Sequence, residues 1–131
     1  MNLDDLSLLR DIDRDDMLSY IDAFPDQLAD AWALAQTQPL PDSHRAPRQV
    51  VVCGMGGSAI GGDLTAALVA GTAPVPFSVV RGYDLPAYVA GPETLVVLSS
   101  FSGNTEETLA AAEEAASRGA ASAGTGAPVT P

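Results

Sequence analysis

The chain has 131 residues, enough for about one domain, and 47% of them are hydrophobic. Its six basic residues, all arginine, are outnumbered by 17 acidic ones, which gives a net charge of −11. That charge does not suit binding to nucleic acid or to an anionic membrane, because both attract positive surfaces. The sequence contains no apolar run near the ~20 residues that cross a bilayer and no signal-peptide pattern at its start. We therefore expect a cytoplasmic protein with neither nucleic-acid nor membrane partners.

The chain holds one cysteine, Cys53, and one histidine, His44. A single cysteine cannot form an intrachain disulfide, and a single histidine cannot form half of a histidine metal pair. We expect no metal site and no functional role for either residue.

Residues 1–47 are predicted to be a helical lead-in followed by a linker. Apolar residues recur at helical spacing over 14–36, and Pro25 divides this stretch into two short helices. Nine aspartates lie in the first 30 residues, and we interpret them as a solvated helix face. The proline-rich and polar stretch that begins at Thr37 predicts the linker.

Residues 48–119 have the pattern of an α/β domain. Short apolar runs at 50–53, 77–80 and 95–98 predict strands, and helical spacing follows at 64–68 and 109–116. This order predicts a parallel sheet with right-handed crossovers. If the first strand lies between the other two, the loops that follow the first and third strands line one crevice, where ligands of open α/β sheets bind.

Residues 120–131 offer only Val129 as a large aliphatic side chain where a fourth strand should follow. We expect this tail to be disordered and the sheet to stop at three strands. A sheet this short suggests a truncated or frame-shifted version of a longer protein.

The loop after the third predicted strand carries several hydroxyl groups just ahead of a predicted helix. Ser100, Ser102 and Thr105 would join the free amides of the first helical turn in holding a phosphate, and Gly103 would let the backbone approach it. The alternative is a capped helix with Asn104 as the cap and a glutamate three residues later. The sequence leaves both interpretations open.

The turn after the first strand, GMGGSA (54–59), fits the G-x-G-x-x-G/A dinucleotide fingerprint, which is weak evidence by itself. Arg81 stands at the end of the second strand, where it could accept the 2′-phosphate of NADP. Alternatively, Gly57 and Ser58 contact a sugar, or the glycines serve only tight helix–strand packing. Gly61 and Gly62 within the following helix also indicate a close approach by a ligand or another helix.

The segments GMGGSAIGGD (54–63) and SSFSGNTEET (99–108) together resemble the sugar isomerase (SIS) domain. The closest similarity is to the bacterial bifunctional phosphoglucose/phosphomannose isomerase family. VVRGYDLPAYV (79–89) and the lead-in MLSYIDAFPDQLADAWALA (17–35) are also similar to that family. The resemblance covers about residues 14–119.

The resemblance implies a flavodoxin-like, three-layer parallel fold, with two SIS domains in the intact protein and a homodimer as its assembly. It implies interconversion of glucose 6-phosphate, mannose 6-phosphate and fructose 6-phosphate through a cis-enediol, without metal, nucleotide or other cofactor. Matching motifs assign phosphate contacts to Ser100, Ser102 and Thr105 with the backbone from Gly103 to Asn104. The sugar-side contacts fall on residues 57–58.

The family's catalytic arginine, glutamate, histidine and lysine belong to later segments that this sequence does not contain, so we assign no catalytic residue. Glu106 and Glu107 begin a helix beside the phosphate and do not replace them. We expect a fragment that binds hexose phosphate but has negligible turnover. The alternatives are a non-catalytic SIS sensor and an NADP-binding Rossmann fragment.

Overall fold

The computed structural model describes residue 4 and residues 6–126, which form two compact units that meet between Pro39 and Leu40. Within these residues, no helix is both long enough and apolar enough to cross a membrane. The two units are described separately below.

The first unit is helical. Its helices are α1 (Leu6–Ile12), α2 (Met17–Asp22) and α3 (Phe24–Thr37). The predicted pair of helices within 14–36 is therefore confirmed, with Pro25 in the first turn of α3, where its missing N–H costs nothing. The sequence pattern did not predict α1.

One of the N-terminal aspartates has a local structural role. The carboxylate of Asp13 accepts hydrogen bonds from the backbone N–H groups of Met17 (2.9 Å) and Leu18 (2.7 Å). These amides lie in the first turn of α2, where backbone donors have no intrahelical partner. Asp13 therefore stabilises the start of α2 in addition to being solvated.

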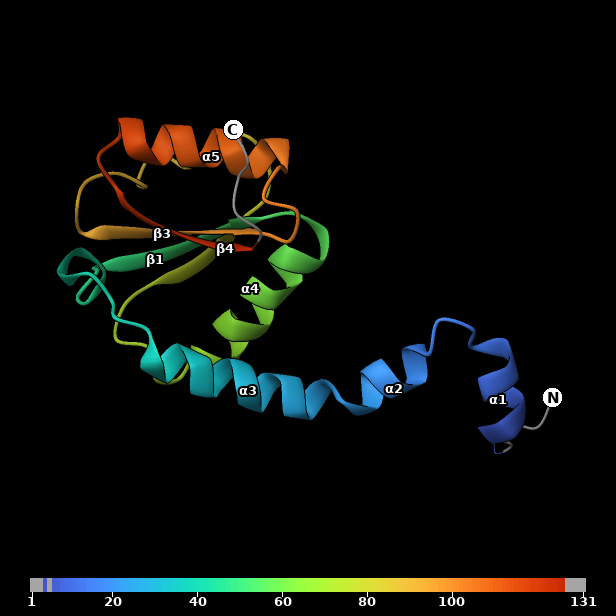
Figure 1. The fold of residues 1–131 in the computed structure, drawn as a ribbon. Coiled ribbons are helices and arrows are strands. Elements are labelled where there is room, and N and C mark those ends of the chain that lie inside the picture. The colour runs from blue at the N-terminus through green and yellow to red at the C-terminus, as the bar shows by residue number, and fades with distance from the viewer. Residues whose placement is uncertain (1–3, 5, 127–131) are drawn as a thin grey trace. The chain divides into compact units, whose positions relative to one another are not determined.

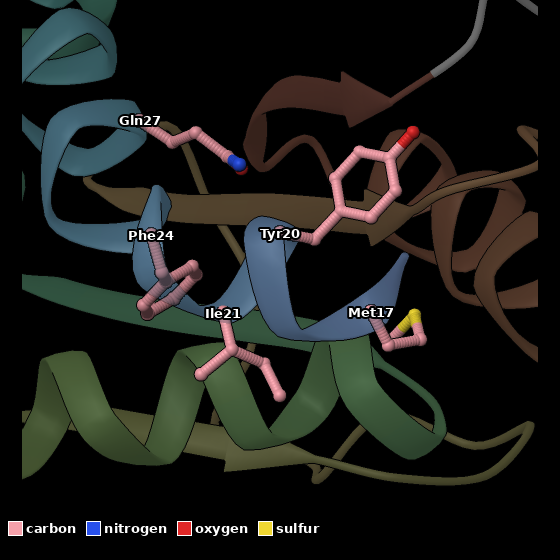
Figure 2. Close-up of a pocket in the computed structure, with 5 residues that line it drawn as sticks. All are labelled: Met17, Tyr20, Ile21, Phe24 and Gln27. Carbon is pink, nitrogen blue, oxygen red and sulfur yellow. The ribbon is translucent and has the colours of Figure 1, made fainter. Parts of the chain in front are cut away.

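No described residue of α1, α2 or α3 is buried. An apolar hollow of about 340 Å³ is lined by Met17, Tyr20, Ile21, Phe24 and Gln27. Figure 2 draws these five side chains. Large side chains such as Trp32 are 70% exposed. Among the described residues, this unit has no hydrophobic core of its own.

The second unit is a four-stranded parallel sheet with helices on both faces. Its elements are η1 (Asp42–His44), β1 (Gln49–Gly54), α4 (Gly56–Val69), β2 (Phe77–Val80), β3 (Thr94–Ser100), α5 (Glu106–Ser117) and β4 (Ala121–Gly126). The strand order is β2-β1-β3-β4, and all neighbours pair in parallel. The three predicted strands are confirmed, and β1 lies between β2 and β3, as a shared crevice requires.

The prediction of a disordered tail over 120–131 is wrong for residues 121–126, which form β4, while 127–131 lie outside the described residues. β4 pairs with β3 from Leu95 opposite Ala121 to Ser100 opposite Gly126. Parallel pairing uses backbone groups, so small residues can satisfy the free edge of β3 without filling a buried side-chain position. The sheet therefore has four strands among the described residues, not three.

The boundary between the units also differs from the predicted one at residue 47. Residues 40–47 belong to the second unit, because η1 packs against β4. The proline-rich stretch is therefore partly ordered against the sheet.

The two faces of the sheet are covered by different helices. Figure 1 shows α5 on one face and α4 on the opposite face. Val51 and Val96 pack on the α5 side with Ala111 and Ala115, and all four are at most 1% exposed. This arrangement confirms a parallel three-layer α/β fold.

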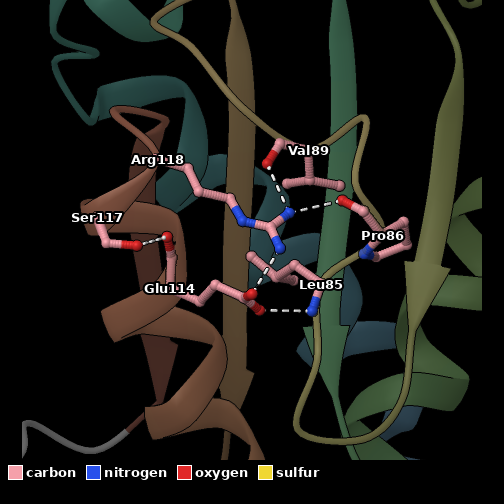
Figure 3. Close-up of polar contacts among 6 residues, drawn as sticks. All are labelled: Leu85, Pro86, Val89, Glu114, Ser117 and Arg118. Carbon is pink, nitrogen blue, oxygen red and sulfur yellow. Dashed lines mark hydrogen bonds and ion pairs between the residues drawn. The ribbon is translucent and has the colours of Figure 1, made fainter.

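The connection from β2 to β3, residues 81–93, packs under α5 without forming a helix. It contributes Leu85 and Val89 to the core. Figure 3 shows how it is held: Glu114 accepts the Leu85 N–H (2.6 Å), and Arg118 donates to the carbonyls of Pro86 (2.8 Å) and Val89 (3.3 Å). Arg118 also pairs with Glu114 at 2.5 Å. The Leu85 N–H and the carbonyls of Pro86 and Val89 thus find side-chain partners at the C-terminal end of α5, whereas in a helical connection they would pair with its own backbone.

Cys53 lies in this core with 2% of its surface exposed. Burial raises the pKa of its thiol to about 11, because the charged thiolate loses its solvation. The thiol is therefore protonated at neutral pH, as expected of a structural cysteine.

Candidate anion-binding site

The loop between β3 and α5 gathers the predicted phosphate-binding residues into one hydrogen-bonded turn. The hydroxyls of Ser100 and Thr105 lie 2.9 Å apart, and the Gly103 N–H donates to Ser100 Oγ at 3.1 Å. The Asn104 N–H donates to Ser102 Oγ at 3.2 Å. The loop thus holds its shape through contacts among its own residues.

These residues differ in exposure, and the difference separates their roles. Ser100 is only 6% exposed, and its hydroxyl stabilises the loop by accepting the hydrogen bond from the Gly103 N–H. Ser102 and Asn104 are exposed, and Thr105 is half-buried. Of the four side chains, only the last three are accessible from the surface.

The Ser100–Thr105 pair also leaves one hydroxyl hydrogen available. Two hydroxyls joined by one hydrogen bond use only one of their two hydrogens. Ser100 Oγ already accepts from the Gly103 amide, so Ser100 can donate to Thr105 and leave the Thr105 hydrogen free. In that arrangement the half-buried Thr105 has a hydroxyl hydrogen to offer to a ligand.

Gly103 is required by the backbone itself. Its φ is +73°, in the left-handed region that residues with a Cβ adopt rarely. The sequence had suggested close approach of a ligand, and the turn geometry supplies a second reason for glycine here.

The alternative of a capping box is not observed. The N-cap of α5 is Thr105, not Asn104, and it makes no side-chain cap bond; Glu107 does not reach back either. The first helical bond joins the Leu109 N–H to the Thr105 carbonyl at 3.0 Å. The amides of residues 106–108 consequently have no acceptor among the described residues. They form the positive end of the helix dipole.

The glycine turn after β1 also begins a helix whose N-terminus lacks a side-chain cap. Met55 is the N-cap of α4, and the Ser58 N–H bonds to the Met55 carbonyl at 3.1 Å. A Cβ built on Gly57 would meet nothing within 4 Å. The space in front of this turn is therefore open, as a ligand-contacting role for residues 57–58 requires.

The two glycines farther along α4 have different explanations. A Cβ on Gly62 would lie 3.1 Å from Val52 Cγ1 and 3.2 Å from Val79 Cγ2, so Gly62 serves tight helix–sheet packing. A Cβ on Gly61 would meet nothing within 4 Å. Packing between α4 and the sheet therefore explains Gly62 but does not explain Gly61.

The two turns start from neighbouring strands, with Gly54 paired to Ser99 across β1 and β3. A cavity of about 410 Å³ between α4 and the sheet is lined by residues that include Ser58 and Ser99. The hydroxyl of Ser100 engages the loop on the other side of the sheet, because successive residues of a strand alternate between faces. A single pocket shared by both turns stays a prediction.

Two contacts and one unpartnered hydroxyl near the site were not predicted from the sequence. Arg81, considered above for a 2′-phosphate, forms an ion pair with Asp63. The Tyr83 phenol donates to Glu106 Oε2 at 3.3 Å. Thr108, in the first turn of α5, is 6% exposed, and its hydroxyl has no partner among the described residues.

Only one of these had a signal in the sequence. Thr108 precedes Ala111 and Ala115 at the spacing of a buried helix face. The Tyr83–Glu106 contact joins residues 23 positions apart, and no periodicity predicts it.

A family model described as "SIS domain" matches residues 45–124, which covers the sheet, both helices and both turns. The chain belongs to the SIS domain family. The match extends to Gly124 within β4, so it includes most of the strand that the sequence pattern had missed.

The SIS chain is also similar to proteins named bifunctional phosphoglucose/phosphomannose isomerase. The protein from Caldicellulosiruptor bescii is 43% identical over 96 residues, which cover 73% of this chain and 28% of that protein. The Aquifex aeolicus protein is 46% identical over 71 residues, 53% of this chain and 22% of that protein. The SIS chain thus spans about a quarter of the length of these relatives.

A crystal structure from Salmonella typhimurium LT2, of a protein assigned as a phosphosugar isomerase, has the same fold. Its TM-score is 0.54 at 25% identity, over 66% of this chain and 31% of that chain. These similarities place the chain among isomerase-related SIS domains.

Proposed function

We propose that this SIS chain is the sugar-phosphate-binding part of a glucose-6-phosphate/mannose-6-phosphate isomerase. The phosphate would bind at the N-terminus of α5, and the sugar would extend toward residues 57–58. The names of the relatives support the choice of reaction and substrate class.

One observation carries the binding proposal: the first turn of α5 has free amides at 106–108 beside the hydroxyls of Ser102 and Thr105. Backbone amides at a helix N-terminus favour an anion through both hydrogen bonds and the helix dipole. The described loop contains no lysine or arginine, so the anion would be held by dipoles and hydroxyls rather than by a fixed charge.

We further propose that the 131-residue chain does not isomerise sugars by itself. A general base must reach the substrate proton within hydrogen-bond distance. Glu106 and Glu107 begin α5 at the phosphate end, away from C1 and C2 of a sugar bound in this orientation. The isomerase reaction would need acid–base groups from outside this sequence.

The binding proposal is tested by calorimetry of Ser102→Ala with fructose 6-phosphate. Ser102 is exposed, so its loss should leave the fold intact and weaken binding by about 1–3 kcal/mol, the range for one hydrogen bond to a charged group. An unchanged Kd would mean that Ser102 only shapes the loop through Asn104. Titration with NADP serves as the control, since tighter binding of NADP would favour the dinucleotide alternative.

A further inference from the structure

Tyr83 contacts Glu106 from a connection that other hydrogen bonds also hold to α5. Residues 81–93 are held to α5 by Glu114 and Arg118. The nearest of these bonds joins Glu114 to Leu85, which is two residues beyond Tyr83. The ring of Tyr83 is 53% exposed, and its phenol donates to Glu106 Oε2 at 3.3 Å. The anchored segment thus places a phenol beside the first residue of α5.

Glu106 is a potential competitor for the proposed anion site. It is the first residue of α5, and a carboxylate in the first helical turn is attracted to the free amides there. In this structure no side chain caps that terminus, and the carboxylate of Glu106 is bonded to Tyr83 instead.

We propose that Tyr83 is a positioning residue that holds the Glu106 carboxylate away from the amides of residues 106–108, so that the phosphate of a ligand can take them. This inference rests on the proposed function, because it concerns the same helix terminus. It adds a residue from the β2–β3 connection, outside the two glycine- and serine-rich motifs.

Two further observations concern the same helix terminus. The charge of Glu107, burial, and the charge and hydrogen bond of Glu106 raise the pKa of Tyr83, so the phenol remains a donor throughout the neutral range. The buried hydroxyl of Thr108 has no partner among the described residues. Helical side chains lean toward the N-terminus of their helix, so this hydroxyl lies on the side of the proposed phosphate.

The test is a set of four full-length variants titrated with inorganic phosphate and with fructose 6-phosphate. Tyr83→Phe should raise the Kd for both ligands about threefold to tenfold, the effect of one lost hydrogen bond. Glu106→Gln should bind at least as tightly as the parent, because it removes a like charge. The double variant Tyr83→Phe/Glu106→Gln should recover the affinity of Glu106→Gln.

Tyr88→Phe is the matched control, since Tyr88 is 58% exposed on the same connection and its side chain carries no assigned role. A Tyr83→Phe variant that binds like the parent would overturn the proposal. So would a double variant as weak as Tyr83→Phe, because Tyr83 would then contact the ligand directly.

A measurement without ligand separates this inference from the proposed function. In the ligand-free protein, Tyr83→Phe should shift the amide NMR signals of residues 106–108, because the released Glu106 carboxylate then accepts hydrogen bonds from these amides. The same tyrosine substitution made in the Glu106→Gln background should leave those signals in place. If phosphate binds to no variant, the proposed function fails, while these amide shifts still decide whether Tyr83 controls Glu106.

Discussion

Replacing Gly54 with alanine is expected to destabilise the second unit by about 1–3 kcal/mol, the usual cost of overpacking. A Cβ at this position would lie 2.8 Å from the Ser99 carbonyl oxygen on β3. The obstacle is backbone, so no side-chain rotation relieves it, and the ends of β1 and β3 must move apart. Both candidate turns begin at these ends, so sugar-phosphate affinity should fall together with stability. Thermal unfolding and calorimetry with fructose 6-phosphate measure the two effects.

Gly61→Ala is the matched control for Gly54→Ala. It lies in α4, where an added Cβ would meet nothing within 4 Å. Alanine is favoured over glycine in a helix by about 1 kcal/mol, so this variant should be equally or more stable. Equal melting temperatures for the two variants would contradict the steric account of Gly54.

Arg118→Ala should lower the free energy of unfolding by about 2–4 kcal/mol, because hydrogen bonds to charged groups are stronger than neutral ones. The side chain donates to two backbone carbonyls and to Glu114, and 27% of it is exposed. Its loss would leave the Glu114 carboxylate with only the Leu85 amide and release the connection between β2 and β3. Denaturant unfolding gives the value directly.

Arg48→Ala provides the comparison for Arg118→Ala. Arg48 pairs with Glu93 at 3.6 Å, but both side chains are mostly exposed, at 79% and 67%. Exposed ion pairs contribute about 0–1 kcal/mol. If both arginine variants lost the same stability, the bonds of Arg118 to the backbone would not be the cause.

The strands that the sequence predicted correctly are those with strong local signals. β1, β2 and β3 each contain a run of β-branched or large apolar residues. β4 has no such run, since its sequence is ASAGTG, and it forms because β3 offers a free backbone edge. That stabilisation comes from tertiary structure and leaves no pattern in the strand itself.

The burial of α4 was equally hard to predict. The residues whose spacing predicted the helix include Leu64 and Leu68, which are 67% and 82% exposed. The face that meets the sheet is formed by Ala59 and Gly62 instead. Hydrophobic spacing therefore predicted the helix correctly, but not which of its faces packs against the sheet.

At the candidate site, the sequence predicted the residues of the loop but not how the loop is arranged. Asn104 and Glu107 had the spacing of a capping box, yet Thr105 adopts the extended backbone of the N-cap (φ −69°, ψ 119°). The choice of cap depends on backbone angles fixed by Gly103 and by the Ser100–Thr105 contact. Neither constraint can be derived from residue spacing.

The most direct test of the proposed phosphate site is an amide NMR titration with glucose 6-phosphate and, separately, with glucose. We predict that glucose 6-phosphate shifts the amide signals of residues 105–108 and that glucose at the same concentration leaves them in place. Unchanged signals for these residues with glucose 6-phosphate, or equal shifts with both sugars, would contradict phosphate binding at the N-terminus of α5.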